Sequence, residues 1–280
     1  MRIRLIFILI CLFHVCNAQA DRKKGIHLLQ RIHNYAISID TSKQTKHEYY
    51  SYVRTTIDVK RRNFLLPLVP TVYVIAHGRQ RQYISESYNK IISRGYNDYS
   101  IQTLLRTTTI PRKKEPLTNL NKYLAPRLYE KTIIDNTLLS PFHPANFKFY
   151  QYRIIVAHSN TIHIRFIPKR YNTRLIKGDA EVDYITGRII KCNFSGEYDM
   201  ISFSSQLELG KKGIMSLLPH YGTTQFQFRF MANLITGSMT AYYNLNKPLS
   251  DSINNGDNFK QMSLLRPDSL SPTLKDFSNN

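Results

Sequence analysis

The spacing of apolar side chains changes once along this chain of 280 residues. Near the N-terminus apolar residues recur at every third or fourth position, with basic and amide side chains between them, which predicts an amphipathic helix over residues 26–39. The apolar positions of this helix are Ile26, Leu29, Ile32, Ala36 and Ile39. From His47 onward the spacing is two, which is the period of a β-strand.

Three later segments alternate between apolar and polar residues, namely 162–167, 203–209 and 225–230. One apolar face and one polar face is typical of antiparallel strands that are covered on one side only. Residues 71–77 have the same period, although both of their faces are apolar, and we expect them to form another strand. The 19 Tyr and 14 Phe residues suit such strands.

The connections between these segments are short. In residues 183–188, Gly187 is expected in the left-handed position of a hairpin turn, and Ser159 with Asn160 forms a second tight turn. Residues 111–146 contain five prolines and interrupt the strands, with a short helix expected at 117–124. Residues 246–280 are rich in Asn, Ser, Asp and Pro, so we expect a linker or a disordered tail there.

These elements predict an α+β fold with one domain over residues 21–245. Its main part is a large antiparallel sheet, and a sheet of this length needs a cover over its apolar face. The expected helices at 26–39 and 117–124 are the available covers.

The first twenty residues have the organisation of a secretory signal peptide. Arg2 and Arg4 precede an apolar run over residues 5–15, and Ala18-Gln19-Ala20 supplies a small-residue cleavage site. The run is shorter than the roughly 20 apolar residues that a membrane-spanning helix needs. A lipoprotein anchor is the alternative, but it requires a small residue before the cysteine, and Cys16 follows Val15. We therefore expect an exported protein that begins near Asp21.

Export changes what the charge implies. The chain has 39 Lys and Arg residues against 19 Asp and Glu, a net charge of +20, and loss of Arg2 and Arg4 with the signal peptide lowers it by two to +18. An exported basic protein meets anionic lipid head groups or acidic glycans rather than nucleic acid.

Five basic clusters lie at expected strand ends or in loops, where charge is either simply solvated or forms one face toward an anionic surface. The residues proposed for contact with an anionic membrane are Lys60, Arg61, Arg62, Arg79, Arg81, Arg112, Lys113 and Lys114. Further basic pairs stand at Lys169-Arg170 and Lys211-Lys212.

Candidate chemistry is sparse. Two of the three cysteines lie in the signal peptide, so Cys192 remains alone and is expected to pack as a small hydrophobe. The nine histidines do not show metal-binding spacing. Asp179, Glu181 and Asp183 share a strand face, but a turn and a solvent-exposed position explain them without catalysis or Ca²⁺. We expect no enzyme, catalytic residue, metal or cofactor, with a secreted hydrolase as the less favoured alternative.

Several stretches together resemble an exported family of unknown function from Bacteroidetes outer-membrane proteins. They are His47–Arg62, Tyr83–Ser87, Leu139–Phe142, Phe149–Arg153, Ile164–Arg170, Gly178–Asp183, Thr186–Ile189 and Arg266–Pro272. The resemblance covers roughly residues 45–275. Members place a carboxypeptidase-regulatory-like β-sandwich before this region and a membrane β-barrel after it. Since neither is expected within this chain, the resemblance does not imply membrane insertion here.

The hairpins from Ile167-Pro168-Lys169 to Thr186-Gly187 are also similar to the lipoprotein-carrier fold of LolA and LolB. That fold is a strongly curved antiparallel sheet, an incomplete barrel closed by helices, whose concave face holds acyl chains. The resemblance implies a non-enzymatic protein of the periplasm or the outer-membrane surface that binds lipid or lipoprotein acyl chains or supports an envelope assembly. A structural or interaction module without a small ligand is the alternative. The expected apolar lining consists of Ile162, Ile164, Phe166, Phe203, Phe226, Phe228 and Phe230.

Overall fold

The computed structural model describes residues 25–39, 47–69, 72–76, 78, 80–93, 99–109, 126–134, 137–158, 160–198 and 200–245. An N-terminal helix spans residues 25–39. The first strands and short helices are β1 (His47–Arg61), η1 (Leu66–Leu68), α2 (Tyr73–Ala76), β2 (Gln82–Ser93), β3 (Tyr99–Thr108), β4 (Thr132–Ile134), β5 (Leu138–Leu139) and η3 (Pro144–Phe149). The remaining elements are β6 (Tyr150–His158), β7 (Thr161–Pro168), β8 (Lys177–Asp183), β9 (Ile189–Tyr198), β10 (Ile201–Leu209), η4 (Gly213–Leu217), β11 (Pro219–Phe230) and β12 (Asn233–Leu245).

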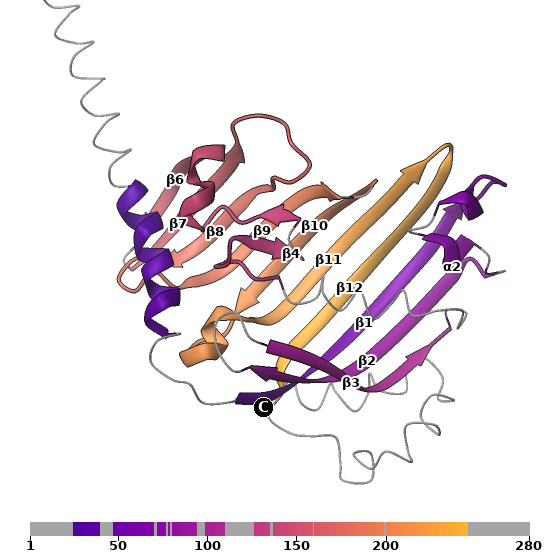
Figure 1. The fold of residues 1–280 in the computed structure, drawn as a ribbon, viewed down its shortest axis with the longest axis horizontal. Helices are drawn as coiled ribbons and strands as arrows, with labels where there is room; N and C mark the ends of the chain where they lie inside the picture. The colour runs from indigo at the N-terminus through magenta and orange to yellow at the C-terminus, as the bar shows by residue number, and fades with distance from the viewer. Residues whose placement is uncertain are drawn as a thin grey trace, which may run out of the picture.

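Ten strands form one antiparallel sheet in the order β3-β2-β1-β12-β11-β10-β9-β8-β7-β6 (Figure 1). β1–β3 form one meander and β6–β12 a second, and the pairing of β1 with β12 joins them. β4 and β5 make a separate two-stranded ribbon in the segment between the meanders. The expected large antiparallel sheet with few helices is confirmed.

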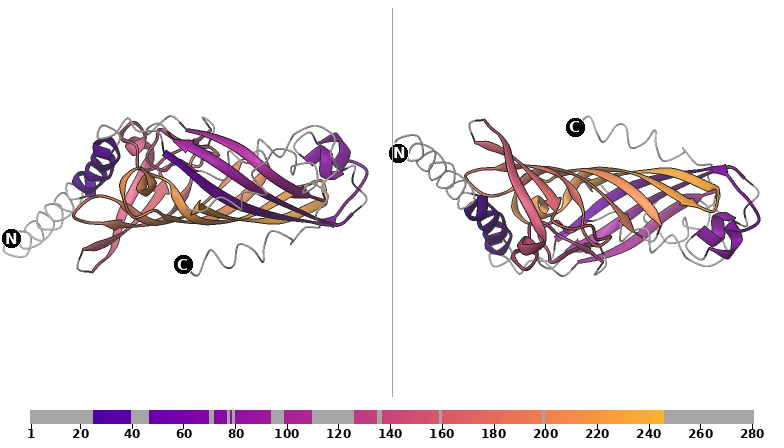
Figure 2. Two further views of the ribbon diagram at one scale, coloured as in Figure 1. Left: turned by 90° about the horizontal axis from the view of Figure 1, so that it is seen from below. Right: turned by 90° about the horizontal axis from the view of Figure 1, so that it is seen from above.

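The sheet is curved. In the edge-on views of Figure 2, the N-terminal helix, α2, β2 and β3 all lie on the same side of β10–β12. We call the side that carries the buried clusters the core face and the opposite side the outer face; the sheet curves toward its core face. β3 and β6 are the edges and do not pair with each other among the described strands, so the barrel is incomplete.

The N-terminal helix covers the core face of β6–β10. Its side chains Leu28, Leu29, Ile32 and Ala36 are buried in one cluster with residues of β7–β10 and of the 126–150 segment. The helix is therefore confirmed, but its inward face is rotated relative to the sequence expectation, since Ile26 is 52% exposed. Arg31 contributes a second attachment, because its guanidinium lies over the ring of Tyr184 in the β8–β9 turn, 4.8 Å from the centroid.

The β8–β9 turn confirms the left-handed conformation expected for Gly187 and the turn position expected for Asp183. Gly187 has φ +84°, and a Cβ at that position would stand 2.6 Å from the carbonyl oxygen of Arg31, so only glycine fits both the turn and the helix. Asp183 accepts hydrogen bonds from the N–H groups of Ile185 and Thr186. Burial opposes ionisation of Asp183, but these bonds outweigh it and hold the pKa of the carboxyl below its ordinary value.

Two smaller clusters occupy the rest of the core face. At one end of β1, β2, β11 and β12, the short helices η1 and α2 bury Leu66, Val69, Val72 and Ala76 against the sheet. The other cluster includes side chains of β1, β2 and β12 and the η4 region: Tyr49, Val53, Ile91, Leu218, Met239, Ala241 and Tyr243.

Residues 72–76, the part of the expected 71–77 strand that the structure describes, do not form a strand, because α2 spans Tyr73–Ala76. Val72, just before this helix, and Ala76 within it pack onto the sheet. The apolar character of the segment therefore reflects a cap over the end of the sheet rather than a strand with two buried faces. The strands expected at 162–167, 203–209 and 225–230 are confirmed. The signal peptide, the 117–124 helix and the 246–280 tail lie outside the described residues.

The β11–β12 hairpin has an unusual turn. Phe230 pairs with Asn233, so Met231 and Ala232 are the two turn residues. Their φ angles are +45° and +63°, in the left-handed region. Two-residue turns of this kind favour Asn and Gly, because a Cβ costs about 1–2 kcal/mol in that conformation.

We expect Ala232→Gly to stabilise the protein by roughly 0.5–1 kcal/mol, since relief of the left-handed strain exceeds the added chain entropy of glycine. Thermal unfolding followed by circular dichroism should show Tm higher by about 1–3 °C. An unchanged or lower Tm would mean that Ala232 does not adopt positive φ in solution.

Two histidines meet where the helix packs against the loop before η3. The rings of His33 and His143 are 5.3 Å apart in an edge-to-face arrangement. Burial lowers the pKa of His33 below its ordinary value of 6.5. Burial also lowers the pKa of His143, and the neighbouring His33 and Lys131 add to the effect.

Because both pKa values are lower in the folded state, the unfolded chain binds more protons near pH 6. The contribution of this pair to stability is therefore complete above the unfolded pKa of 6.5 and is lost as the pH falls below it. We expect Tm to fall between about pH 7 and about pH 5, and the double variant His33→Gln/His143→Gln to lose part of that dependence. An identical pH profile for both proteins would contradict this.

Candidate functional site

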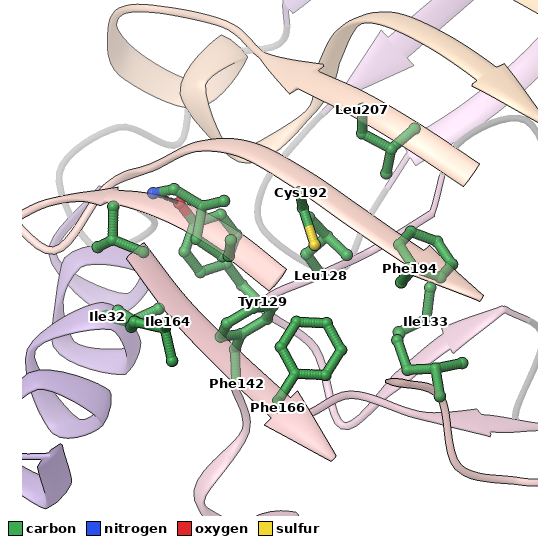
Figure 3. Close-up of a cluster of buried hydrophobic side chains, with 14 of the residues drawn as sticks. Ile32, Leu128, Tyr129, Ile133, Phe142, Ile164, Phe166, Cys192, Phe194 and Leu207 are labelled. Carbon is green, nitrogen blue, oxygen red and sulfur yellow. Dashed lines mark hydrogen bonds between the residues drawn. The ribbon is translucent and has the colours of Figure 1, made fainter. Parts of the chain in front are cut away.

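The seven apolar residues expected to line a cavity all lie on the core face, but in two separate clusters. Ile162, Ile164 and Phe166 of β7 are buried in the cluster under the N-terminal helix. Figure 3 shows Ile164 and Phe166 there, among side chains that include Ile32 and Phe142. The rings of Phe142 and Phe166 are 5.5 Å apart.

The other four residues lie farther along the sheet. Phe228 is buried in the cluster beneath η1 and α2, with Phe226 and Phe230 packed against it. Phe203 packs against the helix-side cluster and pairs with Phe226 in the sheet register, so these two rings connect the clusters. Phe226 lies over Gly237, where a Cβ would stand 2.2 Å from its ring.

Between the clusters the core face is built from small side chains, which we call the small-residue floor. The larger side chains of Val53 and Met239 stand in the same two rows of the register as its members, which are Thr55, Ser85, Ser87, Ser205, Gly222, Thr224 and Ala241. Ser205 and Thr224 bond to each other through their hydroxyls at 2.9 Å. The floor is bordered by the row of Phe203, Phe226 and Tyr83 on one side. Large side chains thus stand around these small ones on the concave side of the sheet, and Val53 and Met239 stand among them.

A polar group borders the floor. The amide of Asn89, 1% exposed, donates to the hydroxyls of Ser51 and Ser87 at 3.4 and 3.2 Å. The Thr103 hydroxyl donates to the Asn89 carbonyl oxygen at 3.0 Å. Neither these residues nor the floor can be recognised in the sequence, because Ser and Thr at core positions look like outward-facing residues in a period-two pattern.

The expected basic residues that the structure describes gather at one end of the sheet. Lys60 and Arg61 end β1, and Arg81 precedes β2; all three are exposed. Arg62 beside them donates to the carbonyls of Ile75, Gly78 and Gln80. Arg79, Arg112, Lys113 and Lys114 lie outside the described residues, and contact with an anionic surface stays a prediction.

The outer face has a hollow of about 560 Å³ over β1 and β10–β12. Phe203, Phe226 and Gly237 also line it, although the register places them on the core face. The outward side chains of the lining are hydroxyls and amides with one carboxylate: Thr56, Asp58, Ser202, Ser204, Gln225, Gln227, Thr236 and Ser238. Such a lining suits a neutral polar ligand or a polypeptide surface rather than an acyl chain.

Next to this hollow, a carboxylate is buried on the outer face. Glu86 accepts from the Tyr52 hydroxyl at 2.8 Å and from the Arg54 guanidinium at 2.9 Å, and its side chain is fully buried. Burial, followed by the hydrogen bond and charge of Glu86, raises the pKa of Tyr52. Tyr52 in turn stacks on Tyr242, with the ring centroids 6.5 Å apart.

The remaining candidates for chemistry are engaged elsewhere. Over the residues that the structure describes, no group of three His, Cys, Asp or Glu could hold a metal ion. Asp179 accepts from the amide of Asn193 at 3.1 Å, and Asp183 organises its turn. Cys192 is a buried free thiol, as expected, and burial raises its pKa. Among the described residues, no helix has both the length and the apolar character needed to cross a membrane.

Residues 36–246 match the family of unknown function DUF5686, and the chain therefore belongs to this family. The expected membership of a family of unknown function is confirmed, whereas the outer-membrane context that the resemblance implied stays a prediction. No curated protein matches the chain at a significant level.

Solved structures provide weak similarities. The LolA superfamily protein from Nitrosomonas europaea is 13% identical, with 81% of this chain and 97% of that one covered and a TM-score of 0.25. A DUF1329 family protein from Desulfovibrio piger is 10% identical, with coverages of 82% and 98% and a TM-score of 0.23. The MucA/MucB complex of Pseudomonas aeruginosa is 8% identical, with 86% of this chain and 99% of that one covered and a TM-score of 0.22. Likenesses of this size identify neither a ligand nor a partner of this chain.

The ion pair between Arg54 and Glu86 leads to a prediction about the free energy of unfolding. We expect Arg54→Met to cost about 2–4 kcal/mol, because it removes a guanidinium that is bonded to a buried carboxylate, while the partial exposure of that guanidinium limits the loss. The double variant Arg54→Met/Glu86→Met should recover most of the lost stability. Urea unfolding of both variants is the measurement, and equal losses would show that the pair does not act as a unit.

Proposed function

We propose that this member of the DUF5686 family is an exported, non-enzymatic protein of the cell envelope that holds a lipid or lipoprotein acyl chain on its core face. The observation that supports this is the small-residue floor. It lies on the concave side of the sheet, bordered by large side chains of the apolar clusters, and shares Ala241 with the cluster that includes Tyr49. Ligand sites are commonly concave, mostly apolar and equipped with a few polar groups.

The chemistry of the floor fits an amphiphile. Gly222, Ala241 and Met239 offer apolar contact to a chain, and methionine adapts to irregular shapes. The hydroxyls of Ser51 and Ser87 accept from the Asn89 amide and keep their own protons to donate to an ester or carboxyl group at one end. Among the residues expected to line the site, Phe203 and Phe226 border the floor directly.

The alternative is an interaction module without a small ligand. The hollow on the outer face favours it, because its lining of hydroxyls and amides with the single carboxylate of Asp58 suits a protein surface. The two functions use opposite faces of the sheet, so variants separate them.

Filling the floor tests the acyl-chain proposal. Thr55 and Ser85 face each other across β1 and β2, and Thr55→Leu/Ser85→Leu adds bulk between them. If the floor takes up a ligand chain, we expect the variant to keep its Tm and to lose at least tenfold in affinity for a long-chain fluorescent fatty acid. Mass spectrometry of lipid that co-purifies from gently extracted protein should show the same loss.

Thr56→Leu is the matched control, because it is a neighbour in the same strand that faces outward into the hollow. It should leave fatty-acid binding unchanged. Overpacking a filled interior costs about 1–3 kcal/mol. A strong fall in Tm of Thr55→Leu/Ser85→Leu, with no fatty-acid binding by the parent chain, would therefore refute the proposal and favour the interaction module.

A further inference from the structure

Apolar side chains are exposed at the end of the sheet where the basic residues gather. Phe64 is 85% exposed, Leu68 74% and Met231 61%. Phe64 and Leu68 belong to the β1–β2 connection, and Met231 to the β11–β12 turn. We call residues 60–68, 81 and 229–232 the loop tip; Figure 2 shows this end of the molecule opposite the N-terminal helix.

The charged side chains of the loop tip are all positive. Between Asp58 and Glu86 the sequence contains Lys60, Arg61, Arg62, Arg79 and Arg81 and no Asp or Glu. Arg229, which is exposed, adds another cation from β11. The only described ion pair here joins Lys60 to Asp58 at 3.6 Å, and the side chain of Lys60 is still 55% exposed.

Hydrogen bonds hold the two loops of the tip together. The Asn63 N–H donates to Asn233 Oδ1, and Asn233 Nδ2 donates to Asn63 Oδ1, both at 2.7 Å. Asn63 Nδ2 also donates to the Met231 carbonyl at 2.6 Å. Below them, the fully buried Leu66 anchors η1 to the sheet. Phe64, Leu68 and Met231 are therefore presented on a fixed base.

The turn conformation supports a role for Met231. Asn or Gly would adopt the positive φ at this position with less strain, but the chain has an exposed methionine there. Left-handed non-glycine residues often mark functional sites. Met200, 57% exposed with φ +64°, repeats the arrangement in the β9–β10 turn at the same end of the sheet.

We propose that the loop tip docks this protein on an anionic phospholipid bilayer, with Phe64, Leu68 and Met231 inserted among the head groups and the basic side chains on the lipid phosphates. Apolar side chains within a cationic surface are the combination that interfacial membrane binding requires. The proposal rests on the proposed export and names the surface that the protein meets. It does not depend on acyl-chain binding.

A bilayer fits the tip better than a protein partner does. Phe64 and Leu68 are largely exposed at the end of the sheet, where a protein would need a matching pair of apolar pockets. Lipid head groups adapt to projecting side chains and supply negative charge at every point around them. Attraction of the charges alone falls away within about 8 Å at physiological salt, whereas inserted apolar groups keep their contribution.

Co-sedimentation with vesicles tests the proposal, using the chain without residues 1–20. Vesicles of phosphatidylcholine with phosphatidylglycerol should bind it, and phosphatidylcholine alone should bind it much more weakly. Lys60→Gln/Arg61→Gln should weaken binding at low salt by about fivefold for each charge. Phe64→Ser/Leu68→Ser should weaken it more than tenfold at both low and physiological salt.

Matched controls come from the opposite end of the sheet. Ile185 is 64% exposed in the β8–β9 turn, and Lys211 and Lys212 are exposed after β10. Ile185→Ser and Lys211→Gln/Lys212→Gln should therefore bind like the parent chain. Met231→Asn should raise Tm and weaken vesicle binding, a combination that loss of structure would not produce.

The sequence contains no Trp, which provides a direct probe of insertion. Phe64→Trp should show a blue-shifted emission with anionic vesicles and quenching by brominated lipid, and Ile185→Trp should show neither. Binding only to lipopolysaccharide, equal losses in the control variants, or no binding to anionic vesicles at low salt would overturn the proposal. Fatty-acid binding by the same samples is measured separately, so a lack of vesicle binding would not affect the test of the acyl-chain proposal.

Discussion

The pairing of β1 with β12 is the interaction on which the rest of the structure depends. It joins strands from opposite ends of the described chain, with Tyr50 opposite Leu245 and Arg61 opposite Leu234. Without it, β1–β3 and β6–β12 would be two separate meanders, each with an additional open edge. The small-residue floor spans this joint, as does the link between Asn63 and Asn233 that holds the loop tip. Both proposed binding regions therefore exist only when β1 and β12, the first and last described strands along the chain, are paired.

The fold class could be predicted because strands such as 225–230 alternate strictly and bury one face. The floor could not, since Thr55 and Ser85 occupy core positions with hydroxyl side chains, and only the register reveals that they face inward. The segment 71–77 was wrongly expected as a strand because local spacing does not show that Val72 and Ala76 pack over the end of a sheet. The basic residues near Arg61 were found from charge alone, but the exposure of Phe64 and Leu68 depends on tertiary packing around Leu66.

The distribution of side chains separates three surfaces of one sheet. The core face holds the apolar clusters, the outer face carries hydroxyls, amides and paired charges such as Lys191 with Glu208, and the loop tip combines cations with exposed apolar groups. Because strand residues alternate between faces, a substitution in one strand acts on one surface while its neighbour acts on the other. A protein built in this way can change the chemistry of one surface without repacking another.

An open sheet also has edges. β3 and β6 each pair on one side only among the described strands, and Ile154 of β6 is 42% exposed. Unpaired strand edges are templates for association with further copies of a chain. Here the large positive charge keeps copies apart, because repulsion acts before edge contacts can form. Salt screens that repulsion, so colloidal stability should decline as ionic strength rises, and dilute, low-salt conditions are the ones in which single molecules persist.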